Sequence, residues 1–245
     1  MITLSNLNKS FSKNVVINKL NLQINSGEIT ALVGHNGAGK TTLIRLISGI
    51  YKPDSGKIEV SNGSKIGVLL GGDINLYGNL TGYEIIKYFG LLNGLTSTKI
   101  NERINILDDI LKFSTFIKKR AFTYSRGMKQ KIGLVISIIH DPDILLLDEP
   151  STGLDLEAAN DVITFIKYLK SNNKTILIAT HNIFEISDLS DNIAFISKGK
   201  INDVIATKEF FENCPPDEKN AYLIQAMKGG LSGENSFNGS EKRIN

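Results

Sequence analysis

Apolar and polar residues alternate along the first part of the chain, from Ile2 to Ile24, with turn-forming residues near positions 12–14. This period of two predicts antiparallel strands. A short apolar run with β-branched residues follows at 29–33, then a glycine-rich segment, and then apolar residues at helical spacing from Thr41 to Ile50. The order of strand, glycine loop and helix is typical of the first half of a βαβ unit.

The rest of the chain changes between strand and helix patterns several times. Two short strands are expected at 58–60 and 66–70, and helical periodicity then dominates from about Leu80 to His140. The later part predicts, in order, a strand at 144–147, a helix at 157–170, a strand at 175–179, a helix at 184–189 and a strand at 193–196. Uniformly apolar strands separated by helices indicate parallel strands buried on both faces. We therefore predict an α/β fold, with a mixed sheet core, an N-terminal antiparallel β subdomain and an inserted helical subdomain.

The glycine-rich segment reads GHNGAGKT, from Gly34 to Thr41, and matches the pattern GxxxxGK[ST]. Successive backbone N–H groups of such a loop surround an anion, and glycine permits the torsions and the close approach that this requires. Lys40 stands at the start of the helix, where it adds a full charge to the positive end of the helix dipole. The Thr41 hydroxyl is placed to bind Mg²⁺. The alternative is a glycine-rich turn with a chance lysine, and the flanking strand and helix favour nucleotide binding instead.

Two acids, Asp148 and Glu149, follow the apolar run at 144–147. A buried strand brings its terminal carboxylates to the carboxyl edge of the sheet, where open α/β folds bind ligands. Asp148 can join a Mg²⁺ shell, and Glu149 is suited to act as the general base for an attacking water. The alternative, a turn or helix cap after a strand, is disfavoured by the phosphate loop in the same chain.

The composition adds a few limits. The chain has 245 residues, of which 41% are hydrophobic and 22% charged, and a formal net charge of +3. This charge is too small to indicate nucleic-acid binding on its own.

Cys214 is the single cysteine, so no intramolecular disulfide can form, which favours a reducing compartment. No apolar stretch approaches the ~20 residues that span a bilayer, and the polar start of the sequence is not a signal peptide. A membrane role would therefore need a partner that spans the bilayer.

Further motifs surround the carboxylate strand. YSRGMKQ lies upstream at 124–130, STGLD follows at 151–155, and Thr180-His181 ends the next strand. In order and spacing, together with the phosphate loop and the acid pair, these motifs resemble those of the ATP-binding cassette (ABC) family of transporter ATPases, over roughly Ile2 to Ile205. The resemblance implies a P-loop NTPase.

The same resemblance divides the chain. An ABC ATPase domain is expected over 1–215, with its helical subdomain inserted at about 78–140. A C-terminal extension is expected at 216–245, and its Gly/Ser/Asn-rich composition predicts disorder from about 229.

The resemblance also implies a role for each matching residue. Glu149 would be the catalytic base, and His181 would be the switch histidine beside the γ-phosphate. The residues that would contact ATP are Phe11 on the adenine, the Walker A residues Gly34, Asn36, Gly37, Ala38, Gly39, Lys40, Thr41 and Thr42, and the partner-facing residues Ser125, Gly127 and Asp155. Thr41 and Asp148 would bind Mg²⁺. The ordinary alternatives are a core aromatic for Phe11, a surface histidine for His181 and a helix cap for Asp155.

The chain departs from the family pattern at two places. Its signature reads YSRGM rather than LSGGQ, so Arg126 replaces a glycine and adds charge near the partner's nucleotide. Such forms resemble those of drug, sodium or polysaccharide exporters. The glutamine that family members carry after the strand at 66–70 is missing, and the sequence there is Leu70-Gly71-Gly72-Asp73. The two glycines suggest a hinge, and no metal-ligand role is assigned to this loop.

The function implied by the resemblance is an ATP-hydrolysing subunit that powers transport, with export favoured. ATP and Mg²⁺ are the implied cofactors. The implied partners are a second copy or a homologous ATPase subunit and a transmembrane permease, with no nucleic acid, on the cytoplasmic face of the cell membrane. The alternatives are a soluble ABC ATPase acting on the ribosome or DNA, an importer subunit, and a non-catalytic scaffold. The sequence does not name the transported substrate.

Overall fold

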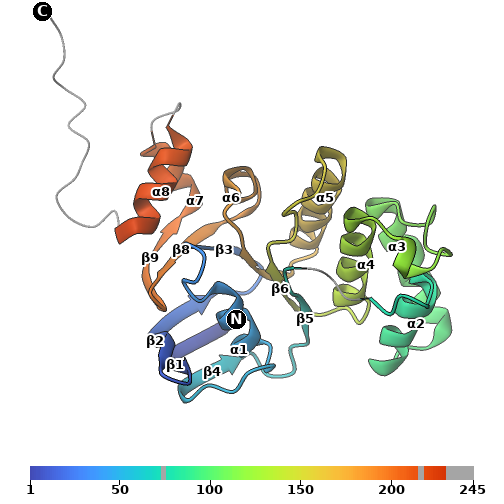
Figure 1. The fold of residues 1–245 in the computed structure, drawn as a ribbon, viewed down its shortest axis with the longest axis horizontal. Helices are drawn as coiled ribbons and strands as arrows, with labels where there is room; N and C mark the ends of the chain where they lie inside the picture. The colour runs from blue at the N-terminus through green and yellow to red at the C-terminus, as the bar shows by residue number, and fades with distance from the viewer. Residues whose placement is uncertain (73–75, 215–217, 230–245) are drawn as a thin grey trace, which may run out of the picture.

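The computed structural model describes residues 1–72, 76–214 and 218–229, which form two β-sheets with helices packed around them (Figure 1). In chain order the elements are β1 (Ile2–Phe11), β2 (Asn14–Ile24), β3 (Ile29–Val33), α1 (Lys40–Ile47), β4 (Ser55–Val60), β5 (Ile66–Leu69), α2 (Gly82–Leu92), α3 (Ser97–Leu111), the short 3₁₀ helix η1 (Ala121–Thr123), α4 (Arg126–Ile138), β6 (Ile144–Asp148), α5 (Leu156–Ser171), β7 (Thr175–Ala179), α6 (Ile183–Leu189), β8 (Asn192–Ser197), β9 (Lys200–Ala206), α7 (Thr207–Glu212) and α8 (Lys219–Gly229).

The two sheets differ in strand direction. The larger sheet has the order β5-β6-β7-β3-β8-β9, in which β9 runs antiparallel to β8 and all other neighbours are parallel. The smaller sheet, with the order β2-β1-β4, is antiparallel throughout. The predicted mixed sheet and antiparallel N-terminal subdomain are thus confirmed. Because β6, β7 and β3 are adjacent and parallel, the loops that follow them open at the same edge of the sheet.

The larger sheet is covered on both faces, which explains why its parallel strands are apolar throughout. One face packs against α4, α5 and α6, and the other packs against α1 and the smaller sheet. Helix α1 therefore lies between the two sheets and buries Leu43, Ile44, Leu46 and Ile47 there. A helix packed on both sides holds the residues at its start, Lys40 and Thr41, in a fixed position relative to the larger sheet.

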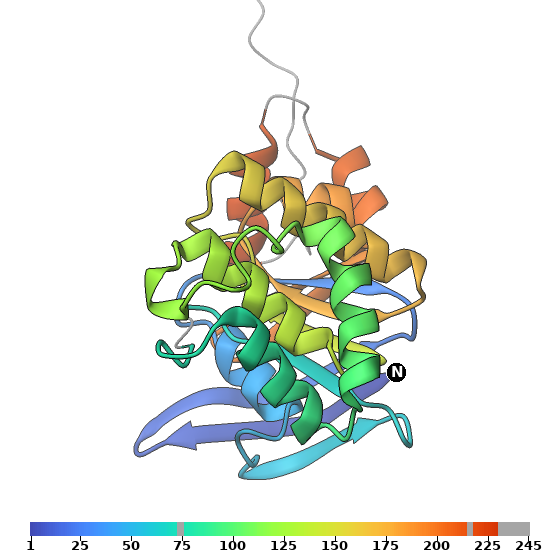
Figure 2. The same ribbon diagram turned by 90° about the vertical axis from the view of Figure 1, so that its right-hand side faces the viewer.

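Helices α2, α3 and α4 form the predicted helical insertion at one end of the molecule (Figures 1 and 2). Thr81 begins α2 with a capping box, because its hydroxyl accepts from the Glu84 N–H while the Glu84 carboxylate accepts from the Thr81 N–H. The buried Tyr124 hydroxyl accepts a hydrogen bond from the Gly82 N–H at 2.9 Å. Tyr124 therefore joins the start of α2 to the residue that precedes the N-cap of α4.

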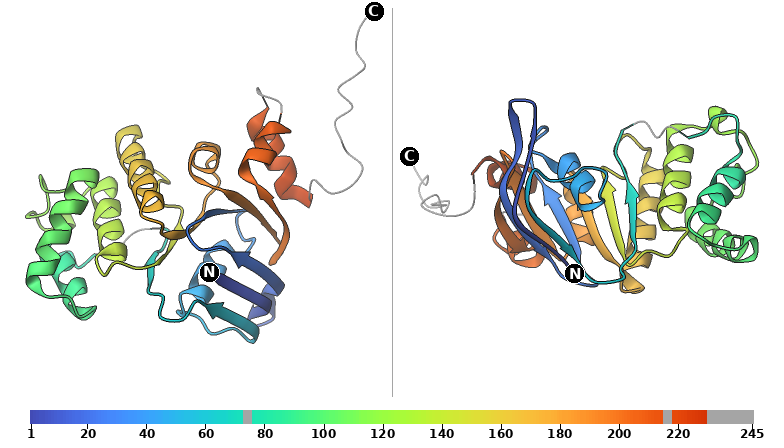
Figure 3. Two further views of the ribbon diagram at one scale, coloured as in Figure 1. Left: turned by 180° about the vertical axis from the view of Figure 1, so that it is seen from behind. Right: turned by 90° about the horizontal axis from the view of Figure 1, so that it is seen from below.

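The sequence patterns do not predict β9, α7 and α8, which lie at the opposite end from the helical insertion (Figures 1 and 3). Phe210 of α7 packs these elements together, since its ring lies 5.6 Å from that of Phe195 in β8 and 5.1 Å from that of Tyr222 in α8. The tail after Gly229, for which the sequence predicts disorder, lies outside the described residues. Within the described ranges, no helix combines the length and apolar composition that a bilayer crossing needs.

Candidate active site

A cleft of about 450 Å³ lies over the loop between β3 and α1, at the edge where β6 also ends. It is lined by Val16, His35, Asn36, Gly37, Gly39, Lys40, Thr41, Thr42, Asp148 and Glu149. The structure therefore brings the predicted phosphate loop and the predicted acid pair together. Two further loop residues, Gly34 and Ala38, are buried and do not line the cleft.

Gly39 is the N-cap of α1 and explains why the loop needs glycine at this point. Its φ is 109°, and a Cβ there would lie 2.9 Å from Ile17 Cδ1 and 3.1 Å from the carbonyl oxygen of Val16. Both the torsion and the close approach to β2 exclude other residues. Because Gly39 offers no side-chain cap, the first N–H groups of α1 are left for a ligand in the cleft.

Lys40, the first residue of α1, is 8% exposed. Its ammonium donates to the carbonyl oxygens of Gly34 and His35 at 2.5 Å and 3.2 Å, within its own loop. Burial lowers the pKa of Lys40 below that of a free lysine, and the carboxylates of Glu149 and Asp148 oppose this effect. The cation thus lies at the cleft, where an anionic ligand would exchange neutral carbonyl partners for charged ones.

Thr41 and Asp148 meet across the cleft. The Thr41 hydroxyl donates to Asp148 Oδ2 at 2.6 Å, and Asp148, the last residue of β6, is buried. The two residues are far apart in sequence and come from α1 and β6, so their pairing depends on the packing of α1 against the larger sheet. The arrangement gathers a hydroxyl and a carboxylate, both hard oxygen donors, beside the phosphate loop.

Glu149 is held at both carboxylate oxygens. Its Oε1 lies 2.9 Å from Nδ1 of His181, and its Oε2 accepts from the Thr152 hydroxyl at 2.6 Å. The Glu149 N–H donates to the carbonyl oxygen of Ala179, the last residue of β7, at 2.8 Å. The residue has a φ of 52°, in the left-handed region that non-glycine residues seldom adopt. The structure thus places His181, which does not line the cleft itself, against an acid that does.

Behind this group lies a buried acid that the sequence reasoning missed, Glu185 of α6, which is 1% exposed. Its carboxylate accepts a hydrogen bond from the Ser151 hydroxyl of the STGLD segment. Burial raises the pKa of Glu185, and hydrogen bonds from Ser151 and Thr180 lower it in part. No sequence signal marks this residue, because a glutamate on a short helix is usually exposed.

Ser125, Gly127 and Asp155 form a second group away from the cleft. Ser125 is the N-cap of α4 and accepts from the Met128 N–H at 3.2 Å, and Asp155 caps α5 by accepting from the Ala158 N–H at 2.8 Å. A Cβ on Gly127 would lie 3.3 Å from that of Ala158, so the starts of α4 and α5 are in contact. None of the three predicted residues lines the cleft of its own chain.

Gln130 of α4 is a further residue that the sequence reasoning did not single out. Its buried side chain donates to the carbonyl oxygen of Pro150 at 2.5 Å, directly after the acid pair. The signature segment is therefore connected to the end of β6 as well as to α5.

Phe11, the residue expected to stack on adenine, stands at the end of β1 and does not line the cleft. Its ring packs edge-on against Tyr51 at 5.3 Å, and the Lys9 ammonium lies 5.5 Å from its centre. The apolar residue that lines the cleft is Val16 of β2. Adenine stacking by Phe11 therefore stays a prediction.

The segment without the family's glutamine is described only as far as Gly72, so Asp73 lies outside the described residues. A Cβ on Gly71 would lie 2.9 Å from the carbonyl oxygen of Asp148. Gly71 therefore passes close to the end of β6, and a side chain at this position would displace Asp148.

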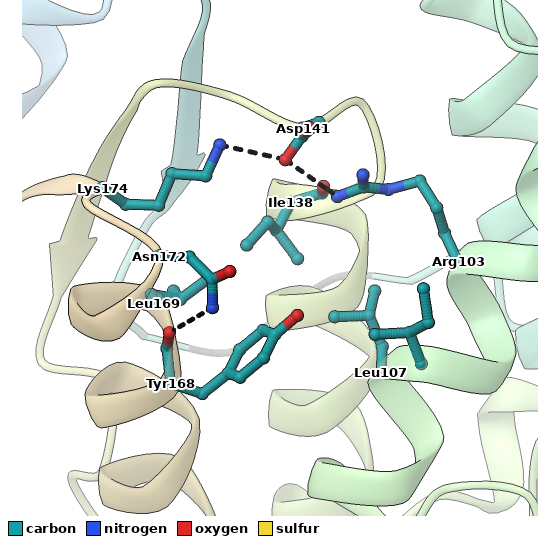
Figure 4. A pocket seen from close by; sticks show the side chains of 9 residues that line it. Arg103, Leu107, Ile138, Asp141, Tyr168, Leu169, Asn172 and Lys174 are labelled. Atoms are coloured by element: carbon teal, nitrogen blue, oxygen red, sulfur yellow. Dashed lines mark hydrogen bonds and ion pairs between the residues drawn. The ribbon is translucent and has the colours of Figure 1, made fainter.

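A second cleft, of about 360 Å³, lies away from the phosphate loop, between α3, the end of α4 and the end of α5 (Figure 4). Asp141 is shared there by two cations, since its Oδ1 lies 3.3 Å from Arg103 Nη2 and 3.0 Å from Lys174 Nζ. Although burial acts against it, these partners hold the pKa of Asp141 below its ordinary value. The two cations are thus partnered, and the group connects the helical insertion to the sheet core.

Comparison with known proteins agrees with this geometry. The family model "ABC transporter" matches residues 17–152. The ABC transporter ATP-binding protein NatA of Bacillus subtilis is 35% identical over 95% of this chain and 100% of its own length. The lantibiotic transport ATP-binding protein SrtF of Streptococcus pyogenes is 34% identical over 86% of this chain and 91% of its own.

Among solved structures, the dimeric ATP-binding cassette MJ0796 bound to ADP and Pi superposes with a TM-score of 0.78, covering 84% of this chain and 99% of that one at 21% identity. This likeness concerns the fold. The sequence matches go further, since they span nearly the whole chain and include the loop, the acids and the signature segment. The chain belongs to the ABC transporter family, as an ATP-binding subunit that hydrolyses ATP.

Proposed function

We propose that this chain powers export across the cell membrane as half of a two-fold ATPase dimer bound to a separate transmembrane partner. The observation that carries the dimer is the separation of the predicted contacts. The phosphate loop and the acid pair line one cleft, while Ser125, Gly127 and Asp155 lie outside it. A nucleotide that is to meet both groups must lie between two subunits, and two-fold symmetry then gives two equal sites.

Each residue of the cleft has a role in this scheme. The N–H groups of the phosphate loop and the Lys40 ammonium bind the phosphates, because both present positive charge to one space. The Thr41 hydroxyl and the Asp148 carboxylate, which are hydrogen-bonded in the cleft, are oxygen donors of the kind that Mg²⁺ prefers. A Mg²⁺ ion bound there would neutralise charge on the phosphates.

Glu149 acts as the general base for the water that attacks the terminal phosphate, with His181 beside it. The hydrogen bonds from Thr152 and His181 fix the direction of the carboxylate before any ligand binds. A base held in this way needs little reorganisation when the site closes. Ser125 of the partner, at the free N-terminus of α4, completes the site on the opposite side.

The surface that meets the transmembrane partner lies on the helical insertion. Tyr77 and Tyr88 are exposed and pack edge-on at 5.9 Å, and Phe122 is 67% exposed and lies close to Gly78. Exposed aromatic side chains that gather on one subdomain are typical of binding surfaces. These three residues, which we call the aromatic patch, would contact a cytoplasmic segment of the membrane partner.

Export, rather than import, is supported by the YSRGM form of the signature and by the relatives, since SrtF is named for lantibiotic transport and is 34% identical. Membrane vesicles that expose this subunit to the medium test the direction. After reconstitution with its membrane partner, MgATP added outside should drive uptake of the substrate into the vesicles. Uptake that occurs only in vesicles of the opposite orientation would refute export.

The dimer itself is tested with Glu149→Gln, which keeps the shape of the side chain but cannot accept a proton. We expect this variant to bind ATP, to hydrolyse it very slowly and to elute as a dimer in gel filtration with MgATP. The same protein with MgADP is the control and should elute as a monomer. A Glu149→Gln variant that stays monomeric in saturating MgATP would contradict the proposed dimer.

A further inference from the structure

Arg126 is the first residue of α4, one position after the N-cap Ser125. This is an unfavourable place for a cation, because the N-terminal end of a helix dipole is positive. The first turn of α4 contains no acidic residue that would compensate. Within the part of the chain that the structure describes, the exposed Arg126 guanidinium makes no hydrogen bond or ion pair. The position therefore presents an unpaired positive charge at the dimer-facing side of the signature.

The guanidinium nonetheless lies against the STGLD segment. A Cβ on Gly153 would lie 2.5 Å from Arg126 Nη1, 2.6 Å from Cζ and 3.1 Å from Nε. All three atoms belong to the flat guanidinium group, so this group rests against the backbone of Gly153. Gly153 has a φ of 73° and no side chain, and both features are needed for this contact.

Two neighbouring contacts keep the two segments together. Gln130 donates to Pro150, and Gly127 packs on Ala158, so the first turns of α4 cannot move away from the segment that contains Gly153 without breaking them. The Arg126 guanidinium thus lies against Gly153 before any partner binds. A preoriented side chain loses less conformational entropy on binding than a free one.

The chemistry of the group indicates its ligand. A guanidinium presents several N–H donors in one plane and matches the oxygens of a phosphate in two-point contact. In the dimer proposed above, the anion next to Ser125 is the terminal phosphate of the partner's ATP. A lone glycine, which the family pattern has at this position, would supply only its backbone there.

We propose that Arg126 contacts the terminal phosphate of the ATP held by the partner subunit, and that Gly153 positions its guanidinium for this contact. This inference rests on the proposed dimer. It adds a charged residue that acts from the opposite subunit, and it assigns the second glycine-containing motif, STGLD, a part in nucleotide binding through its effect on Arg126.

The test measures dimer formation and nucleotide binding separately. In the Glu149→Gln background, the monomer–dimer dissociation constant in MgATP is measured by analytical ultracentrifugation, and ATP binding to the monomer is measured by calorimetry at low protein concentration. Loss of a charge-assisted contact in each of two sites should weaken the dimer by a factor of about ten or more. We therefore expect Arg126→Ala to raise the dissociation constant by at least this factor while leaving monomer binding unchanged.

Two variants serve as controls. Arg126→Lys keeps the charge but loses the planar contact with Gly153, so it should restore part of the affinity. Lys118→Met removes one exposed positive charge from the same helical insertion, outside the site, and should dimerise like the parent. A dissociation constant for Arg126→Ala equal to that of the parent would overturn the inference while the proposed dimer stands. A parent that does not dimerise would overturn both.

The positioning role is tested by a double-mutant cycle with Gly153→Ala. The added methyl group would displace the guanidinium, so this variant should weaken the dimer when Arg126 is present. Backbone strain at the positive φ is the same with or without Arg126 and cancels in the cycle. We expect much less further weakening in the Arg126→Ala background. Additive effects of the two substitutions would refute the role of Gly153.

Discussion

The Thr152 hydroxyl donates a 2.6 Å hydrogen bond to Glu149 Oε2, so the STGLD segment directly holds the proposed catalytic base. The bond joins a loop residue to an acid at the end of a buried strand. Because Gln130 of α4 binds Pro150, directly before this segment, and Gly127 of α4 packs on Ala158, directly after it, a shift in the helical insertion can reach Glu149 without passing through the nucleotide.

The first prediction concerns this hydrogen bond. Thr152→Val keeps the shape of the side chain but removes the donor, so the Glu149 carboxylate loses one of its two fixed partners. A hydrogen bond to a charged group contributes roughly 1.5–3 kcal/mol, so we expect kcat to fall by about tenfold with ATP affinity unchanged. Thr152→Ser is the matched control and should retain most activity. Steady-state ATPase measurements decide the point, and an unaltered kcat for Thr152→Val would contradict it.

A second prediction concerns Lys40. Lys40→Ala removes the full charge that faces the phosphates, so ATP affinity measured by calorimetry should fall by a factor of about thirty or more. The unliganded protein should not be destabilised in proportion, because burial of the ammonium already opposes its charged form. Urea unfolding without nucleotide measures this second effect. Equal ATP affinity of the variant and the parent would show that Lys40 does not bind the phosphates.

The third prediction separates crowding from backbone strain at two glycines that flank α1, Gly39 in the phosphate loop and Gly49 after the helix. Gly39 and Gly49 both have a positive φ, but a Cβ on Gly39 would meet β2 whereas nothing lies within 4 Å of one on Gly49. Gly49→Ala should therefore cost only the strain of a left-handed residue, about 1 kcal/mol. Gly39→Ala should cost about 2 kcal/mol more because of the added clash. Urea unfolding of both variants gives the comparison, and similar losses would show that the contact with Ile17 and Val16 is soft.

The fourth prediction follows from the buried Glu185, whose pKa is raised. Since its folded pKa lies above its unfolded value near 4.5, the folded state holds the proton more tightly. The stability that this proton provides is fully present below the unfolded pKa and is lost as the pH rises through the folded pKa. Glu185→Gln, which cannot ionise, should therefore gain in melting temperature relative to the parent as the pH increases from about 4.5 to 8.

Two measurements accompany this experiment. The charged groups that face Glu185 include Glu149 and His181, so the same pH series in the Glu149→Gln background shows whether they contribute. Asp188, an exposed acid of the same helix that is paired with Lys167, gives Asp188→Asn as the control for removing a carboxylate from this helix. A constant difference between Glu185→Gln and the parent across the whole pH range would show that Glu185 titrates normally.

A fifth prediction concerns the aromatic patch of Tyr77, Tyr88 and Phe122. Phe122→Ser should leave hydrolysis by the isolated subunit unchanged, because Phe122 lies outside the cleft, and should reduce the stimulation that the membrane partner gives. Val204→Ser, an exposed apolar residue on β9 at the other end of the molecule, is the control. Full stimulation of Phe122→Ser by the partner would place the docking surface elsewhere.

Sequence patterns predicted the parallel core well, because its short strands are uniformly apolar and the helices between them carry apolar residues at helical spacing. The strand predicted at 175–179 coincides with β7, and the predicted phosphate loop and acid pair share one cleft. The edge strand β9 was missed because its residues alternate weakly and, among the strands of the described residues, it pairs with β8 alone. Helix α8 was missed because its apolar residues do not form one stripe, since Leu223 and Met227 are buried whereas the neighbouring Ile224 is exposed.

The candidate catalytic residues could be named from the sequence because each stands at a fixed place in a short motif. The residues that hold them could not, since Thr152, Gln130 and Glu185 act through contacts that depend on tertiary packing. Their residue types are common on protein surfaces, and nothing in their local sequence distinguishes them. The contact of Arg126 with Gly153 is of the same kind, because it joins two motifs that the sequence shows separately.

The position of α1 between two sheets limits how this protein can change shape. The helix that begins with Lys40 and Thr41 is packed between the two sheets, so it cannot tilt or slide without disturbing its packing against both. We therefore expect a change of shape on ATP binding to move α2, α3 and α4 relative to the sheet more than α1. Asp141 pairs with Arg103 of the helical insertion and with Lys174 of the sheet core, so it lies at the boundary between these two parts. Because salt screens such ion pairs, high ionic strength should make the movement of the insertion easier.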